Sequence, residues 1–100
     1  MEFNNIAATL DPKDKQYLHL EKCKYIFYHV DLVTVFDYHL KLQKKMDYSD
    51  ICVWCDENTP KNYRSSIIEL NAADQGGVVY ELYFGFEEDE YAVAFKLRWV

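Results

Sequence analysis

The chain has 100 residues, half of them hydrophobic and 17% of them aromatic, and its formal net charge is −6. This length predicts one domain spanning residues 1–100, and the hydrophobic fraction excludes an intrinsically disordered chain. The excess of acids excludes a general nucleic-acid binder, so we expect no direct nucleic-acid partner. No apolar run is long enough for a membrane span, so we expect no membrane association. Three cysteines, an odd number without a disulfide pattern, favour a reducing cytoplasm.

The first half of the chain predicts a helix, a strand and a second helix. Asp11 is a favourable N-cap and Pro12 suits the first helical position, which predicts a helix over residues 12–22. The aromatic and β-branched run CKYIFYHV, residues 23–30, predicts a buried strand. Residues 31–46 have apolar side chains at helical spacing and lysines near their end, where cations suit the helix dipole. We therefore predict a second helix there, although the β-branched residues 33–35 favour a strand.

The second half of the chain predicts three further strands. The run DICVWCD, residues 50–56, predicts a short central strand, and ENTPKNY, residues 57–63, predicts a loop. The runs at residues 65–70 and 78–86 flank the turn NAADQGG and predict an antiparallel hairpin. Alternate residues of the last strand share one face, which we expect to form the core; they are Val78, Tyr80, Leu82, Phe84 and Phe86.

The final residues, EEDEYAVAFKLRWV at 87–100, fit two structures. As a strand, large apolar side chains alternate with small or basic ones from residue 91 to residue 99. As a helix, the acids at residues 87–90 occupy the first turn, while Lys96 and Arg98 occupy the last, an arrangement that complements the helix dipole. The local pattern alone favours the strand.

The same ending, FEEDEYAVAFKLRW, resembles the C-terminal end of many small phage-encoded accessory proteins, over about the last 15 of the 100 residues. In those proteins the acidic stretch starts a short helix whose Phe and Leu pack on the sheet. The resemblance therefore implies a helix at residues 87–100, a viral origin and the host cytoplasm as the location. It implies nothing about activity, and Tyr91, which precedes the alanine here, departs from the pattern and favours the strand.

Together these elements predict an α+β fold: a small single-layer antiparallel sheet of three to four strands packed with two to three helices. A nucleotide-binding α/β fold is disfavoured, because the chain has three glycines and none of them lies in a phosphate-binding loop.

Four residues are candidate zinc ligands. Cys52 and Cys55 have C-x-x-C spacing, and His19 and Cys23 lie four residues apart, so a zinc site would need both pairs, with the second pair on one helical face. We instead expect three buried cysteines that behave as small hydrophobic side chains, with no bound metal and no cofactor. A redox dithiol is disfavoured because two acids follow the C-x-x-C pair and would raise the thiol pKa.

Charge is distributed unevenly along the chain. Residues 13–45 carry seven bases against four acids, whereas residues 46–100 carry four bases against eleven acids. This acidic half predicts a partner with a basic surface. The predicted partner-binding residues are Glu87, Glu88, Asp89, Glu90, Asp56 and Glu57. A DNA-mimicking version of the surface would add Asp47 and Asp50 to them.

We therefore expect a small viral accessory protein that binds a host or viral protein stoichiometrically, for example as a host-takeover or anti-defence inhibitor. No catalytic residue is predicted, because no histidine lies in a pattern with a nucleophile. Two alternatives stay open. One is a small enzyme or ligand-binding protein for a nucleotide-like metabolite, which would have a deep aromatic-lined pocket. The other is a virion or assembly component, which would form a homo-oligomer.

Overall fold

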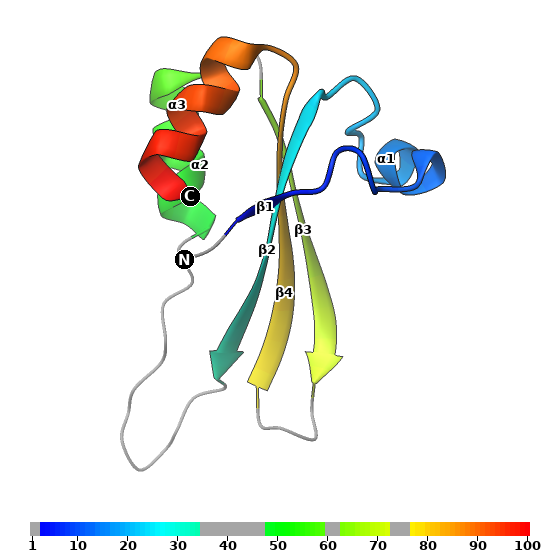
Figure 1. Cartoon of the computed structure of the whole chain (residues 1–100). Coiled ribbons are helices and arrows are strands. Elements are labelled where there is room, and N and C mark those ends of the chain that lie inside the picture. Colours follow the sequence, from blue (N-terminus) through cyan, green and yellow to red (C-terminus); the bar gives the residue numbers. More distant parts are fainter. Residues whose placement is uncertain (1–2, 35–47, 60–62, 73–76) are drawn as a thin grey trace.

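A four-stranded antiparallel sheet forms the centre of the fold, in a computed structural model that describes residues 3–34, 48–59, 63–72 and 77–100. Its strands are β1 (Asn4–Asn5), β2 (Tyr25–Thr34), β3 (Tyr63–Ala72) and β4 (Gly77–Phe86), and the order across the sheet is β1-β2-β4-β3. The described helices are α1 (Pro12–Tyr17), α2 (Tyr48–Asn58) and α3 (Asp89–Trp99). This arrangement confirms the predicted α+β fold (Figure 1).

β4 is the central strand, because both of its edges are paired along their whole length. It pairs with β2 from Tyr25↔Phe86 to Thr34↔Gly77 and with β3 from Tyr63↔Phe86 to Ala72↔Gly77. The β3–β4 pairing confirms the hairpin predicted for residues 65–86. β1 is much shorter and pairs only with Tyr28 and Phe27 of β2.

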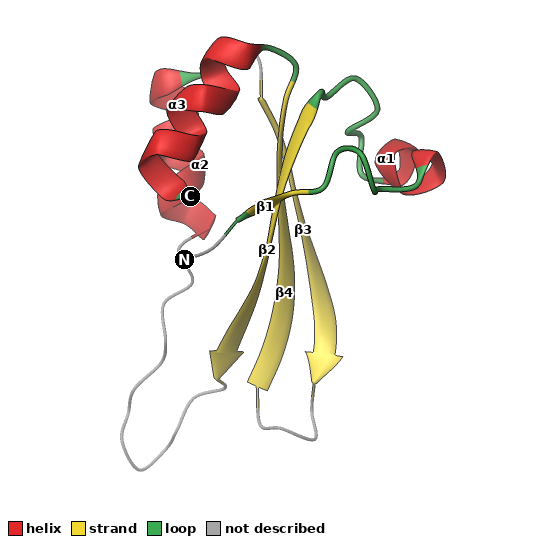
Figure 2. Ribbon diagram, viewed as in Figure 1, coloured by secondary structure: helices red, strands yellow, loops and turns green. Residues whose placement is uncertain are grey.

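The helices lie on opposite faces of this sheet. α2 and α3 cover one face, and α1 lies on the other (Figure 2). On β4, Leu82, Phe84 and Phe86 are fully buried in the cluster that α2 and α3 complete, as the alternating pattern predicted. Tyr83 belongs to the cluster beneath the α1 region. Gly85 points the same way, since a Cβ there would lie 2.6 Å from Cys23 Sγ.

Phe95 of α3 is the centre of the larger core. Its side chain is fully buried, and its ring lies 5.0 Å from that of Phe27, 5.1 Å from Phe86 and 5.4 Å from Phe84, measured between centroids. The rings of Phe3 and Trp54 also contact it. Aromatic rings bury a large apolar area at little rotamer cost, which is how a chain of this size obtains a stable core.

α1 begins where the sequence predicts and ends early. Asp11 caps it, accepting a hydrogen bond of 2.8 Å from the backbone N–H of Lys13. The helix stops after Tyr17 because His19 adopts the left-handed region at φ 60°, and the N–H of Leu20 donates to the carbonyl of Lys15. This is the Schellman ending, here made by a histidine in place of glycine.

Two other sequence predictions are wrong. Residues 50–56 do not form a strand but lie inside α2, because Ile51 and Cys55 are four residues apart and bury on one helical face. The helix predicted from residue 31 does not begin there, since β2 continues to Thr34 through pairing with β4. The rest of that predicted helix, residues 35–46, lies outside the described residues.

The final segment is a helix, as the resemblance implied and against the local strand pattern. Ala92 and Phe95 of α3 are buried against the sheet, whereas Leu97 is 83% exposed. The phenylalanine therefore packs as the resemblance implied, and the leucine does not. Among the described helices, none is long and apolar enough to cross a membrane.

Candidate functional site

A row of three aromatic residues crosses one end of the sheet and positions two of the predicted site residues. Tyr25 and Tyr63 are the partners of Phe86 on its two sides. The Tyr25 hydroxyl donates a hydrogen bond of 2.7 Å to Asp89, and the Tyr63 hydroxyl donates one to Asp56. Because the two tyrosines are two strand spacings apart, about 10 Å, the two carboxylates are held at opposite ends of one short row.

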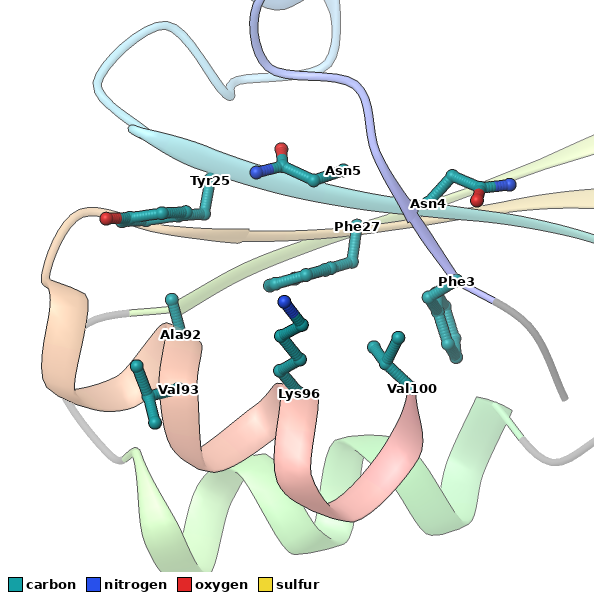
Figure 3. Close-up of a pocket in the computed structure, with 9 residues that line it drawn as sticks. All are labelled: Phe3, Asn4, Asn5, Tyr25, Phe27, Ala92, Val93, Lys96 and Val100. Carbon is teal, nitrogen blue, oxygen red and sulfur yellow. The ribbon is translucent and has the colours of Figure 1, made fainter.

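The fold brings the predicted acids to this end of the molecule, although about thirty residues separate them in the sequence. α2 finishes and α3 starts at the same end of the helical layer, where β2 and β3 begin (Figures 1 and 3). We call this surface the acidic end; its residues are Asp56, Glu57, Glu87, Glu88, Asp89 and Glu90. All except Glu87 are exposed.

The electrostatics of the acidic end are unbalanced. The last turn of α2 carries Asp56 and Glu57 and no base, although the negative end of a helix dipole favours cations there. Within the described residues, none of the six acids forms an ion pair with a lysine or arginine. The hydrogen bond to Asp89 raises the pKa of Tyr25, and burial, followed by the hydrogen bond to Asp56, raises that of Tyr63. Both hydroxyls therefore stay protonated as donors at neutral pH.

Glu87 differs from the other acids of this surface. It lines a small groove of about 200 Å³ on the α1 side of the sheet, together with Arg64 and Cys23. Its charge helps to raise the pKa of the Cys23 thiol, after the larger effect of burial. The side chains of Glu88 and Glu90, by contrast, are exposed.

A pocket of about 340 Å³ lies on the other side of α3, between that helix and the β1–β2 edge of the sheet (Figure 3). Its sheet side is lined by the aromatic rings of Phe3, Tyr25 and Phe27. Its helix side is lined by Ala92, Val93, Lys96 and Val100, and Asn4 and Asn5 of β1 complete the lining. The pocket opens to solvent, because most of its helix and β1 residues are exposed.

Polar groups in this pocket are few. The Asn5 side-chain oxygen accepts hydrogen bonds from the backbone N–H groups of Ala7, at 3.1 Å, and Ile26, at 3.2 Å. This oxygen therefore stabilises the local backbone. The Lys96 side chain extends from α3 toward the Phe27 ring (Figure 3). Its ammonium has no ion pair or hydrogen bond within the described part of the chain.

The four candidate zinc ligands do not come together. Cys55 and Cys52 lie in or against the core beneath α2 and α3, whereas Cys23 is buried on the opposite face of the sheet. His19 and Cys23 do not share a helical face, because α1 has already ended at Tyr17. Within the described residues, no group of three or more His, Cys, Asp or Glu side chains is arranged to hold a metal ion.

The thiols of the two buried cysteines have raised pKa values and are therefore poor nucleophiles. Burial raises the pKa of Cys55 to about 12, with a smaller contribution from Cys52, and burial likewise raises the pKa of Cys23 to about 11. A reactive thiol needs a lowered pKa, so these two thiols behave as small hydrophobic side chains, as the sequence predicted. Cys52, which was also predicted to be buried, is partly exposed, and all three cysteines are free.

Comparisons with protein-family models, with curated proteins and with solved structures give no match for this chain. The phage resemblance of the ending therefore stays a prediction.

The pocket is the feature that sequence reasoning missed. Its lining comes from the first residues of the described chain, from β2 and from successive turns of α3. An aromatic-lined pocket was named only as an alternative, without residues. The useful signal would have been the spacing of Val93, Lys96 and Val100, which share one face of a helix but not of a strand.

Proposed function

We propose that the protein acts by stoichiometric binding to another protein that has a basic surface, through the acidic end. The observation that supports this is the placement of five exposed acids, from the end of α2 and the start of α3, at one end of the molecule, with no ion pair to a described lysine or arginine. Exposed acids without paired bases create a negative surface potential, so a partner with a basic surface would be attracted to this end of the protein.

The anchored carboxylates support the same proposal. Tyr25 and Tyr63, whose strands lie about 10 Å apart, each hold one carboxylate, of Asp89 and Asp56 respectively, through a hydrogen bond from the hydroxyl. A partner that places one cationic side chain at each of these carboxylates would meet preoriented acceptors, so less side-chain entropy would be lost on binding. The surrounding Glu57, Glu88 and Glu90 would act mainly by steering the partner, and this effect weakens as salt screens charges beyond about 8 Å.

The phage-like ending suggests where the partner is found. A host or viral protein in a bacterial cytoplasm is the proposed partner, and inhibition of a host enzyme or defence factor is the proposed outcome of binding. Both parts rest on the resemblance of about the last 15 residues.

The test compares two charge-reversed variants with the wild-type chain in affinity capture from a bacterial lysate, followed by mass spectrometry. The first is Glu88→Lys/Glu90→Lys, at two exposed residues of the acidic end; Glu88 makes no capping hydrogen bond that would be lost. The second is Asp14→Lys/Glu69→Lys, which changes the net charge equally at two exposed residues outside the acidic end. We expect one protein captured near equal stoichiometry by the wild type and by the second variant, and at least tenfold less by the first.

Two results would contradict the proposal. One is equal capture by both variants, which would place the interface elsewhere. The other is the absence of any stoichiometric partner at low salt. Thermal unfolding of both variants controls for folding, and we expect each to lose no more than about 1 kcal/mol of unfolding free energy, because the dipole interaction of a first-turn acid is of that size or smaller.

A further inference from the structure

We propose that the pocket between β1, β2 and α3 binds a small organic monoanion with a flat apolar body, whose negative charge pairs with Lys96. This inference goes beyond the proposed partner binding and uses a different surface, lined by Phe3, Phe27 and Lys96 rather than by the acidic end.

The shape of the pocket is fixed by the core behind it. Phe3 and Phe27 are buried, and each ring contacts Phe95, with centroids 5.3 Å and 5.0 Å apart. Because these rings already pack against Phe95 of α3, the apolar wall of the pocket is formed before a ligand binds. Binding would therefore not cost the free energy of ordering these side chains. The hydroxyl of Tyr25 donates a hydrogen bond to Asp89, so this residue contributes its aromatic ring to the pocket lining and not its hydroxyl group.

The Lys96 ammonium group is the feature that would favour a negatively charged ligand. The other cation in the last turn of α3, Arg98, lies over the Trp99 ring at 4.3 Å and is already engaged. The Lys96 ammonium has no such described neighbour, and its stem carries it from the helix into the gap facing Phe27 (Figure 3). A cation beside an apolar wall attracts an anion more strongly than it would in bulk water, because the wall lowers the local dielectric constant.

Size and charge narrow the class of ligand. The cavity, about 340 Å³, is near the lower limit of roughly 300–1,000 Å³ for small-molecule sites. Lys96 is the one basic residue in its lining, and Asp89 lies at the Tyr25 end of it. Lys96 can pair with one negative charge, and the Asp89 carboxylate would repel any further one, so the site suits an aromatic or aliphatic carboxylate better than a nucleotide that carries two or more charges.

The probes are 2-naphthoate, its neutral amide 2-naphthamide, and adenosine monophosphate, titrated into the full chain and followed by amide chemical shifts in NMR spectra. We expect 2-naphthoate to bind about tenfold more tightly than 2-naphthamide, because a hydrogen bond to a charged group is stronger than one between neutral groups. The shifts should centre on Asn4, Ala92, Val93 and Val100, and adenosine monophosphate should bind more weakly than 2-naphthoate.

Three variants locate the site. Lys96→Met keeps the aliphatic stem and should remove the preference for naphthoate while leaving naphthamide binding unchanged. Lys13→Met removes the same charge from exposed α1 and should change nothing. Val93→Trp, at an exposed lining residue, should fill the pocket and weaken both naphthyl probes.

Several outcomes would overturn the inference. If naphthoate and naphthamide bind equally to the wild type, the charge assignment is wrong. If Lys96→Met retains the full preference, or Val93→Trp binds as the wild type does, the probes bind elsewhere. If neither naphthyl probe shifts the pocket residues at millimolar concentration, the pocket is not a ligand site. None of these results bears on partner capture by the acidic end, which Lys96→Met leaves intact.

Discussion

Phe95 and Leu97 offer a direct test of how the end of the chain is built. They are two residues apart, so a strand would place them on the same face, whereas α3 buries Phe95 completely and leaves Leu97 83% exposed. Removing a buried phenylalanine costs about 3–5 kcal/mol. Phe95 should fall at the upper end of that range, because five other aromatic rings contact it.

Leu97→Ala is the matched control and should change the unfolding free energy by no more than about 0.5 kcal/mol, as for other exposed positions. A domain of this size has a total stability of about 5–15 kcal/mol, so Phe95→Ala could unfold the chain, and Phe95→Leu provides a milder second variant. Urea unfolding followed by circular dichroism measures all three free energies. Similar losses for Phe95→Leu and Leu97→Ala would refute the helical packing of the ending and restore the strand.

Two further predictions concern the α1 face and the buried thiols. Gly85→Ala should cost about 1–3 kcal/mol, because its methyl group would meet Cys23 Sγ at 2.6 Å, and adding Cys23→Ala should recover part of that loss in thermal unfolding; a double variant no more stable than Gly85→Ala alone would contradict the contact. The pKa of Cys55 rises from 9.0 to about 12, chiefly through burial, so the folded state retains a proton that the unfolded state loses. Stability should therefore be full below pH 9 and fall as the pH rises toward 12, and this slope should be shallower in Cys55→Ala; an equal slope in the two proteins would exclude Cys55 as its source.

The sheet was predictable where one face is buried and the alternation is long. In β4, Leu82, Phe84 and Phe86 alternate with residues on the other face over enough positions to exclude a helix. The neighbouring turn residues then set the hairpin with β3. The N-terminal cap of α1 was predictable for a similar reason, since Asp11 and Pro12 act through local backbone chemistry alone.

α2 was not predictable by the same reasoning. A seven-residue run that contains Ile51, Val53 and Trp54 is too short to separate a period of 2 from one of 3.6, and its β-branched residues favour a strand. Contacts distant in the sequence decide the outcome: Trp54 packs on the ring of Phe95, 6.2 Å away between centroids, and Tyr48 donates a hydrogen bond to Ser65. Tertiary packing of this kind overrides local propensity.

The two surfaces differ in how much of them the sequence could reveal. The acids of the acidic end were named individually, because each run of acids is visible locally; their meeting depends on α2, which was predicted as a strand. The pocket needs Phe3, Phe27 and Lys96 to converge from three separate segments. No local pattern encodes such a meeting, which requires the register of β1 on β2 and the rotation of α3.

Some of the charged side chains of α3 have a structural partner and others have none within the described residues. The second group is the reason to assign function to both ends of the helix. Acids in the first turn and bases in the last complement the dipole, but that effect is confined to the terminal turns and amounts to about 1 kcal/mol or less for each group. Asp89 and Arg98 already have structural partners in Tyr25 and Trp99. Glu90 and Lys96 have none among the described residues, and Glu90 belongs to the acidic end, to which α2 contributes acids that oppose its own dipole. The dipole interaction leaves the side-chain charges of Glu90 and Lys96 exposed and unpaired within the described residues, so these two groups are the ones most available to a partner at one end of α3 and to a small anion near the other.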